Sequence, residues 1–567
     1  MALRRNCNAR ALPGQTPPLK KLNVLQKYAA KNRLHIFFSQ GIYIKQKNGA
    51  RARNKGEYFM DRKITEFNLK NEKICLEQTA ELPIEADFTL AEYLGDIKKT
   101  LKCKAVPFVT AKQLSGNTAT VDGTVLISVM YEDADGTLCC GEFEQPFKKS
   151  FDGNEELETA GFEVSCNAVL NTCRAVTERK LSVKGVLRLK VTLKKVAQHN
   201  IIADIDAPDF ETLCGQAETV LPIGITEKST VIDDGFELPE EKPAIFKIIR
   251  TDAAVHTEEP KIINGKVMVS GSLSLCLLYS DKSCAVQKTQ QQFPFSQIVE
   301  IADITEDCRC SVTGELCSLN LTTRTNAEGE CRSVAVVSRI NLTCKACCLQ
   351  TVPLIFDAYS TRKKTDFKTE EVPFTKLAKQ VNETFLCKKQ IDLPEEAETI
   401  CDIWCDPADC SARPSEKGLT LSGSILCGAL HQNSEGEFGY SERMIEFEYP
   451  ILLETPIAAP MCKPKITVSN CEYRPNGRGG AELTVKLAIN ATVYSAESLQ
   501  VLTGLTVDEN TPAVDDNAAL IAYFAQSGEE VWQICKRFCA NRKELLEQND
   551  LKEDRLKENK MLLIPRM

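Results

Sequence analysis

The chain is poor in histidine and tryptophan, and it lacks the short motifs that carry most enzyme chemistry. Its 567 residues include only four His and two Trp. The histidines are scattered and share no sequence context that would indicate a general base. The sequence contains no P-loop, no dinucleotide fingerprint and no nucleophile elbow. We therefore predict that the protein is not an enzyme and binds no cofactor.

Long apolar runs are also absent. No segment approaches the roughly 18 continuous apolar residues that a membrane-spanning helix needs, so we expect no membrane span. The charge is uneven along the chain. Residues 1–60 hold thirteen Lys or Arg and one Glu, a net charge of +12, which leaves −20 for the rest because the whole chain carries −8. An acidic body makes nucleic-acid binding by that body unfavourable.

The basic segment at residues 1–60 allows three interpretations: a targeting segment, an RNA-binding arm, or a leader that is either disordered or the result of a mis-called start. Met60 immediately precedes the first acidic repeat, which favours the last of these. Residues 1–60 are therefore expected to lie outside the fold.

Cysteine, in contrast, is abundant, with 26 in the chain. No secretion signal is visible, and the cysteine positions do not follow the internal repeat, so we predict free thiols in a reducing compartment and no metal site. Zinc binding would need four converging ligands, and the tightest clusters occur only once each. Cross-linking through exposed thiols remains an alternative. The clusters are Cys308-x-Cys310, Cys344-x-x-Cys347-Cys348 and Cys401-x3-Cys405-x4-Cys410.

An internal repeat of about 150 residues organises the chain. Each copy contains a Gly in an alternating strand pattern, then a Tyr or His eight residues later, then a Phe sixteen residues after that. Two further landmarks recur, an acidic-Leu-Pro tripeptide and an Asp at intervals of 151 residues. A unit of this length can bury a core of its own. The landmarks are Gly123, Tyr131 and Phe147; Gly271, Tyr279 and Phe295; Gly423, His431 and Phe447; Glu81, Glu237 and Asp392; and Asp206, Asp357 and Asp508.

The patterns predict a mainly β, multi-domain fold. Alternating apolar residues and Asp-Gly turns indicate strands and hairpins, and an apolar stretch after each acidic-Leu-Pro tripeptide suits one or two short helices per repeat. The recurring acidic residues lie beside Pro or turn residues, where capping is the expected role. The predicted organisation is a leader at 1–60, repeats at 61–208, 209–360 and 361–510, a linker at 511–519 and a small unit at 520–567.

The repeats resemble the SPOCS domain, which is found in spore-coat morphogenetic proteins of clostridia and their relatives. The resemblance rests on the acidic-Leu-Pro-Glu-Glu pattern, the strand Val-x-Gly-Ser-Leu-x-Leu-x-Leu-x-Tyr, and Phe356-Asp-Ala-Tyr-Ser360 at the end of the second copy. It covers about 450 residues.

The unit at 520–567 has a β-α-α-β pattern and resembles a LysM domain. The matching motifs are Tyr523-x4-Gly-Glu-x-x-Trp-x-Ile534, then Leu545-Leu-x-x-Asn-x-Leu551, then Leu562-Leu-Ile-Pro565. LysM domains bind N-acetylglucosamine chains in a groove between two loops. The usual Gly-Asp-Thr of that groove is Gly528-Glu529-Glu530 here, which favours a protein partner over a sugar. The resemblance implies that the binding residues are Ser527, Gly528, Glu529, Glu530, Trp532, Asn549 and Leu551.

SPOCS repeats followed by LysM are similar to the architecture of clostridial coat morphogenetic proteins. In that family the LysM end engages the basement-layer ATPase of the coat at the forespore surface, in the mother-cell cytoplasm. The resemblance implies a non-catalytic adaptor that recruits coat proteins, because several weak contacts sum when they are linked. The alternative is a peptidoglycan-binding protein of the cell wall or the spore cortex.

Overall fold

The computed structural model describes residues 34–38, 42–46, 62–157, 161–455, 457, 460–476, 479–514 and 518–565. The predicted fold class is confirmed: the described chain is mainly antiparallel strand, with two short helices near the C-terminus. Within residues 1–60 the structure describes the backbone of two strands, β1 (Leu34–Phe38) and β2 (Ile42–Gln46). They pair with each other, and β2 pairs with β23 (Ala518–Ala525). The rest of the predicted leader lies outside the described residues.

Six sheets form three pairs, which we call sandwiches one, two and three. In each sandwich one sheet contains a pair of very long strands beside shorter ones, and the other sheet contains shorter strands only. Sandwich one comprises β3 (Lys63–Thr89), β4 (Ile97–Ser115), β5 (Thr118–Asp133), β6 (Leu138–Asp152), β7 (Gly161–Thr177) and β8 (Lys180–Asp206). Sandwich two comprises β9 (Phe210–Glu237), β10 (Lys247–Thr257), β11 (Lys261–Ile263), β12 (Lys266–Ser280), β13 (Val286–Glu300), β14 (Arg309–Thr325) and β15 (Cys331–Ser360). Sandwich three comprises β16 (Lys363–Asp392), β17 (Thr399–Ser415), β18 (Gly418–Gln432), β19 (Phe438–Leu452), β20 (Pro460–Cys462), β21 (Lys465–Pro475) and β22 (Gly480–Pro512).

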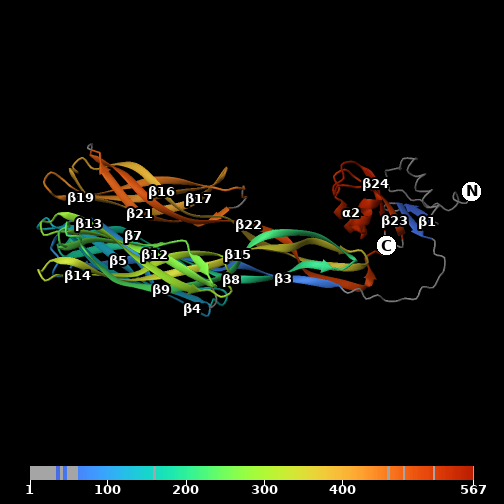
Figure 1. Cartoon of the computed structure of the whole chain (residues 1–567), viewed down its shortest axis with the longest axis horizontal. Helices are drawn as coiled ribbons and strands as arrows, with labels where there is room; N and C mark the ends of the chain where they lie inside the picture. The colour runs from blue at the N-terminus through green and yellow to red at the C-terminus, as the bar shows by residue number, and fades with distance from the viewer. Residues whose placement is uncertain are drawn as a thin grey trace, which may run out of the picture.

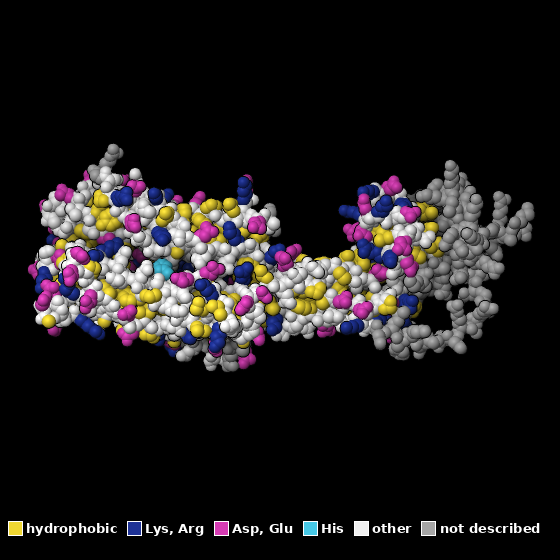
Figure 2. Space-filling model, in the orientation of Figure 1, with side chains coloured by type: hydrophobic (Ala, Val, Ile, Leu, Met, Phe, Trp, Pro, Cys, Tyr) yellow, Lys and Arg dark blue, Asp and Glu magenta, His cyan; other side chains and the backbone are white. Residues whose placement is uncertain are grey.

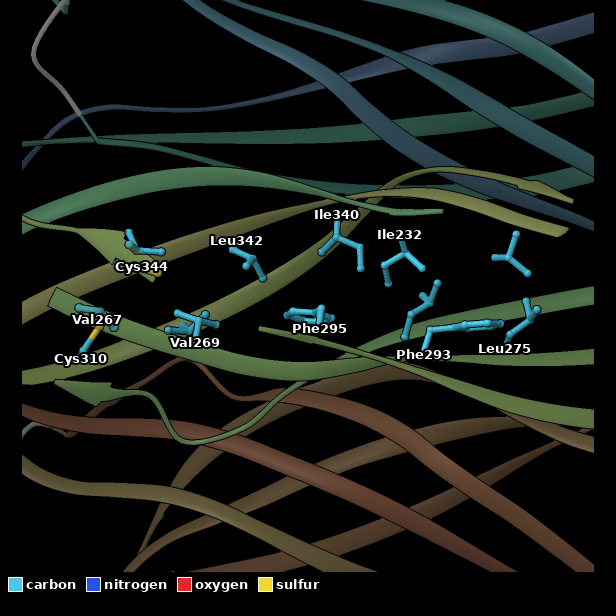
Figure 3. Packing of buried hydrophobic residues seen from close by; sticks show 14 of the residues in the cluster. Ile232, Val267, Val269, Leu275, Phe293, Phe295, Cys310, Ile340, Leu342 and Cys344 are labelled. Atoms are coloured by element: carbon cyan, nitrogen blue, oxygen red, sulfur yellow. The ribbon is translucent and has the colours of Figure 1, made fainter. Parts of the chain in front are cut away.

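Alternation of side chains explains how each sandwich closes. Along β5 and β12 every second residue is buried, because successive side chains of a strand point to opposite faces. The buried faces of the two sheets meet in one core. Figure 3 shows this for sandwich two, where Ile340 and Leu342 of β15 lie over Val269 of β12 and Phe295 of β13. Burial of this apolar area stabilises each sandwich by roughly 25 cal/mol per Å² removed from water.

The recurring Gly and Phe are cross-strand partners. Gly271 lies opposite Phe295, and the same pairing joins Gly123 with Phe147 and Gly423 with Phe447. The Phe ring covers the Gly so closely that a Cβ on Gly271 would lie 2.6 Å from Phe295 Cζ. The recurring Tyr closes a turn, since Tyr131 donates to the Gly95 carbonyl at 3.0 Å and Tyr279 to the Pro243 carbonyl at 3.1 Å.

The long strands continue beyond the sandwiches and form a narrow stalk. The outer halves of the antiparallel strand pairs β3–β8, β9–β15 and β16–β22 lie together between the sandwiches and the C-terminal unit (Figure 1). Thr219 and Thr375, from two of these strand pairs, bond through the Thr219 hydroxyl. The stalk has its own apolar core: Leu69, Ile201, Val352, Leu354, Val372, Phe374 and Val501.

Two details of the prediction are wrong. The short helices expected within the repeats are single turns, in which Leu94, Lys242 and Ala397 donate to carbonyls three residues earlier. Only a few residues separate the flanking strands there, which leaves no room for a helix. The tripeptide at Glu81 lies inside β3, whereas those at Glu237 and Asp392 close β9 and β16.

The prediction of free thiols is wrong for four cysteines. Cys103 of β4 is bonded to Cys173 of β7, which joins the two sheets of sandwich one. Cys308 is bonded to Cys348 in sandwich two. The remaining cysteines of the described chain form no disulfide. The pairings could not be read from sequence because each joins segments that are distant along the chain.

Candidate functional site

The C-terminal unit, which we call the tail module, consists of β23, α2 (Val531–Phe538), α3 (Arg542–Gln548) and β24 (Lys560–Pro565). This is the predicted β-α-α-β order. In α2, apolar residues at helical spacing face the module's core, and Cys539 ends the helix in the left-handed conformation. The Asn541 side chain caps α3 by accepting the Glu544 amide at 3.0 Å. The core is closed by Ile521, Val531, Ile534, Cys535, Leu545, Leu562 and Ile564.

The first predicted groove loop is hydrogen-bonded directly to the second. The amide of Gly528 donates to the Leu556 carbonyl at 2.7 Å, and Val531 donates to the Asp554 carbonyl at 2.7 Å. The Glu529 carboxylate accepts the Tyr523 hydroxyl of β23 at 3.0 Å and the Gln526 amide of its own loop at 3.2 Å. Ser527, Gly528 and Glu530 are exposed, and Glu530 makes no side-chain cap to α2. These three residues therefore form the accessible part of the predicted groove.

Asn549 and Leu551, on the other loop, face inward. The Asn549 side chain donates to the Leu545 carbonyl at 2.8 Å and the Leu563 carbonyl at 2.7 Å, and it accepts the Leu563 amide at 2.6 Å. It is 8% exposed, so its geometry ties α3 to β24. Leu551 packs against the module's core.

Trp532 does not face the loops, because it docks the tail module on the stalk. Its Nε1 donates to Asp357 of β15 at 2.8 Å, and Lys536 forms an ion pair with the same carboxylate at 2.5 Å. Trp532 is 5% exposed and packs edge-on against Tyr359, with ring centroids 5.1 Å apart. Trp532 is therefore held by the stalk on its polar edge and by the module's core on its apolar face.

Two further hydrogen bonds complete this docking contact. The Tyr359 hydroxyl donates to the Ala540 carbonyl at 2.8 Å, and Asn541 donates to Glu211 of β9 at 2.6 Å. Burial raises the pKa of the Tyr359 hydroxyl, and burial also raises the pKa of Glu211. Sequence reasoning missed the docking role of Asp357 and Tyr359. The signal that could have indicated it is that their motif, Phe356-Asp-Ala-Tyr-Ser360, is complete in only one of the three copies. In the third copy, Asp508 lies within β22 and accepts the Asn510 amide at 2.9 Å, so it does not have the predicted capping role.

At the other end of the molecule the three sandwiches meet in a common core. One apolar cluster contains residues from all three: Met130, Leu138, Ile249, Leu278, Trp404, Leu430 and Phe438. Figure 2 shows Lys, Arg, Asp and Glu interspersed over the visible outer face of the sandwiches. The mixture of both signs gives that face no single-sign patch of the kind that attracts nucleic acid.

Partly buried ion pairs join the sandwiches around this cluster. Lys104 of sandwich one lies 2.9 Å from Asp406 of sandwich three and 3.3 Å from Asp252 of sandwich two. Asp402 accepts from Lys288 at 2.9 Å and from Arg250 at 3.4 Å. Burial alone would raise the pKa of Asp252, but the charges of Arg250 and Lys104 outweigh it and hold that pKa below its ordinary value.

A cavity of about 1890 Å³ lies between the sandwiches. It is lined by this ion-pair network, by apolar strand residues and by the thiols of Cys405 and Cys471. The charged side chains on its wall are of both signs, and Lys104 pairs there with Asp252 and Asp406. No group of His, Cys, Asp or Glu in the described part of the chain is arranged to hold a metal ion. Among the described helices, none has the length and apolar character that crossing a membrane requires.

Comparison with known proteins identifies one family. The family described as SipL, SPOCS domain, matches residues 244–323, which lie within sandwich two and include β10, β11, β12 and β13. The chain thus contains a SipL/SPOCS domain, and a LysM domain is not detected. No curated protein and no solved structure matches the chain. The SPOCS domain suggests a role in spore coat assembly and association with the spore coat, and its family is non-catalytic, which fits a structural role.

Proposed function

We propose that this protein is a non-catalytic scaffold of spore coat assembly that recruits coat proteins to the forespore surface from the mother-cell cytoplasm. The match to the SPOCS domain in sandwich two carries this proposal. Sandwiches one and three share its pattern of long and short strands and the cross-strand Gly–Phe pair. We therefore assign SPOCS-like repeats to residues 61–208, 209–360 and 361–510.

The common core and the stalk support a rigid scaffold. The sandwiches share one apolar cluster and the ion pairs of Lys104 and Asp402, and the three strand pairs of the stalk share another cluster. Such contacts hold the three repeats in a constant arrangement, so partner surfaces keep fixed spacings. A rigid array lets weak contacts sum, because binding at one repeat raises the effective concentration of partner at the others.

We further propose that the tail module, residues 520–567, is LysM-like and binds a protein, namely the basement-layer ATPase of the coat. Its β-α-α-β order and its two paired loops support the first part. Trp532 is engaged by Asp357, and Asn549 is engaged by α3 and β24, so neither presents a free surface to a sugar ring. Ser527, Gly528 and Glu530 remain as an exposed, acidic loop that suits a protein partner.

The test uses the full chain and the purified ATPase. Titration followed by fluorescence anisotropy should give a dissociation constant that rises at least about tenfold for Glu530→Lys, or about 1.4 kcal/mol of binding free energy. Glu547→Lys, a charge reversal at an exposed position on α3, is the matched control and should bind like the unchanged protein. No binding, or equal loss in both variants, would contradict the assignment.

Sedimentation of the full chain with peptidoglycan tests the alternative. Our proposal expects the chain to stay in the supernatant. Co-sedimentation that a soluble chitin oligomer abolishes, together with no ATPase binding, would replace the protein partner with a glycan.

A further inference from the structure

Two thiols of sandwich three lie within reach of each other across its two sheets. Cys405 is on β17, and Cys471 is on β21. Their sulfur atoms are 3.5 Å apart, and both residues are free. Cys405 is 8% exposed, so the pair lies at the inner surface of the sandwich.

Cys405 and Cys471 lie on the two strands of sandwich three that correspond to the strands joined by the disulfide of sandwich one. There, Cys103 is on β4, the strand that pairs with β5, and Cys173 is on β7, the strand that pairs with β8. In sandwich three, β17 and β21 pair with the corresponding strands β18 and β22. Cys173 lies opposite Val183, and Cys471 lies opposite Val485, so the two positions correspond in register as well. Cys103 lies opposite Val129, six residues after Gly123, and Cys405 lies opposite Cys427, four residues after Gly423, so these two positions differ by two residues in register. Sandwich one thus holds a bond between its two sheets, and sandwich three holds two unbonded thiols on the corresponding strands.

We propose that Cys405 and Cys471 form a dithiol–disulfide site that is oxidised by a low-molecular-weight disulfide entering the cavity between the sandwiches. Both cysteines line that cavity. The cavity also reaches solvent, since its lining includes Tyr93, which is 84% exposed, and Phe246, which is 53% exposed. A volume of about 1890 Å³ admits a peptide-sized disulfide.

The surrounding groups assign the first step to Cys471. The pKa of Cys471 is lowered, mainly by a hydrogen bond from Cys405. The positive charges of Lys288 and Arg250 also lower it, whereas burial and the negative charge of Asp402 raise it. The pKa of Cys405 is raised, first by its hydrogen bond with Cys427 and then by its hydrogen bond with Cys471. The thiolate is the attacking species in disulfide exchange.

The exchange balances in two steps. The Cys471 thiolate attacks one sulfur of the low-molecular-weight disulfide, forms a mixed disulfide and releases one thiolate. Cys405 then gives up its proton and attacks the Cys471 sulfur, which releases the second thiolate. The two cysteines lose two electrons and two protons in total, and the small disulfide is reduced to two thiols. The product is a covalent bond between the two sheets of sandwich three, like the bond in sandwich one.

The site is tested by peptide mapping of the full chain. The protein is incubated with reduced or with oxidised glutathione, free thiols are alkylated, and the chain is digested without reduction. We expect a peptide pair linked through Cys405 and Cys471 only after oxidised glutathione, with two fewer alkylated thiols per chain. Fragment spectra separate Cys405 from Cys401 and Cys410, which share its tryptic peptide.

Variants assign the two roles. Cys405→Ser should accumulate a glutathione adduct on Cys471, because the second step is blocked, whereas Cys471→Ser should leave Cys405 unmodified. Cys462→Ser, in the same sandwich, should form the cross-link like the unchanged protein. If Cys405 and Cys471 both stay alkylated in oxidised glutathione, or if Cys405 links to Cys427 instead, the proposal is wrong.

Discussion

Replacing Gly271 by Ala should destabilise sandwich two and shift its equilibrium toward locally opened states, because the central strand β12 has no room for a side chain at this position. A Cβ at this position would lie 2.3 Å from the His256 carbonyl oxygen and 2.6 Å from Phe295 Cζ. Real Cβ atoms essentially never approach other atoms within 3.0 Å. The His256 oxygen belongs to the backbone of β10, which pairs with β12, so it cannot move without distorting that pairing.

The magnitude follows from the cost of overpacking a core, which is typically about 1–3 kcal/mol. A clash with backbone as well as with a ring places Gly271→Ala at the upper end, about 3 kcal/mol, which corresponds to roughly a hundredfold change in an opening equilibrium. Removing the ring should recover only part of this. The double variant Gly271→Ala/Phe295→Ala should therefore be less destabilised than the sum of the single variants, while the carbonyl contact still costs stability.

Amide hydrogen exchange of β12 and β13 measures this opening within sandwich two. The rate constants should rise by roughly a hundredfold in Gly271→Ala. The control is Gly224→Ala on β9, where the nearest atom to a Cβ is Ile301 Cγ2 at 3.3 Å. Exchange of β12 that is as slow in Gly271→Ala as in Gly224→Ala would refute the reasoning, and with it the explanation of why Gly recurs at 123, 271 and 423.

Three further predictions concern the tail module, the one histidine at a repeat landmark and the shared ion pairs. Asp357→Asn should weaken the hold on Trp532 and Lys536 by about 1.5–3 kcal/mol, the range for hydrogen bonds to a charged group. Amide exchange of α2 should then speed up by tenfold or more, while Asp508→Asn leaves it unchanged; equal exchange in both would mean that Asp357 does not hold the module. His431 is buried, neither ring nitrogen has a hydrogen-bond partner, and burial lowers its pKa. The unfolded chain therefore takes up a proton before the folded chain does, so stability should fall as pH drops below about 6.5, by at most about 1.4 kcal/mol per pH unit. Urea unfolding between pH 7 and pH 5 should show this slope and lose part of it in His431→Phe; an unchanged slope would exclude His431 as its source. Asp402→Ala leaves Lys288 and Arg250 without their buried partner and should destabilise by about 3 kcal/mol, measured as a lower urea midpoint. Asp409→Ala, at an exposed position on the same strand, should change the free energy of unfolding by less than about 0.5 kcal/mol.

The sequence patterns correctly predicted the strands and helices that are determined by residues close together in the chain. A period of two in β5, β12 and β18 reports strands with one buried face, and the constant spacing of Gly, Tyr and Phe reports a hairpin of constant length. The helical spacing of Trp532, Cys535 and Phe538 reports α2 in the same way. The acidic-Leu-Pro tripeptide led to a wrong prediction of a short helix in the first repeat. Glu81 matches the pattern in sequence but lies inside β3, and that strand continues to Thr89.

The candidate site shows the same limit. The exposure of Ser527, Gly528 and Glu530 follows from a turn that Gly528 makes with a φ of +91°, which the sequence indicated. That Trp532 would bind Asp357 did not follow, because 175 residues separate them and each also fits a purely local role.

By itself, then, the sequence determined a mainly β chain with a recurring Gly–Phe pair and a terminal β-α-α-β unit, since each depends on neighbours within one hairpin or helix. Only the tertiary structure decided which elements meet: Lys104 with Asp406, Trp532 with Asp357, and Cys103 with Cys173. These contacts join segments whose encounter depends on how whole sheets pack, and a local pattern of apolar and polar residues does not encode that packing.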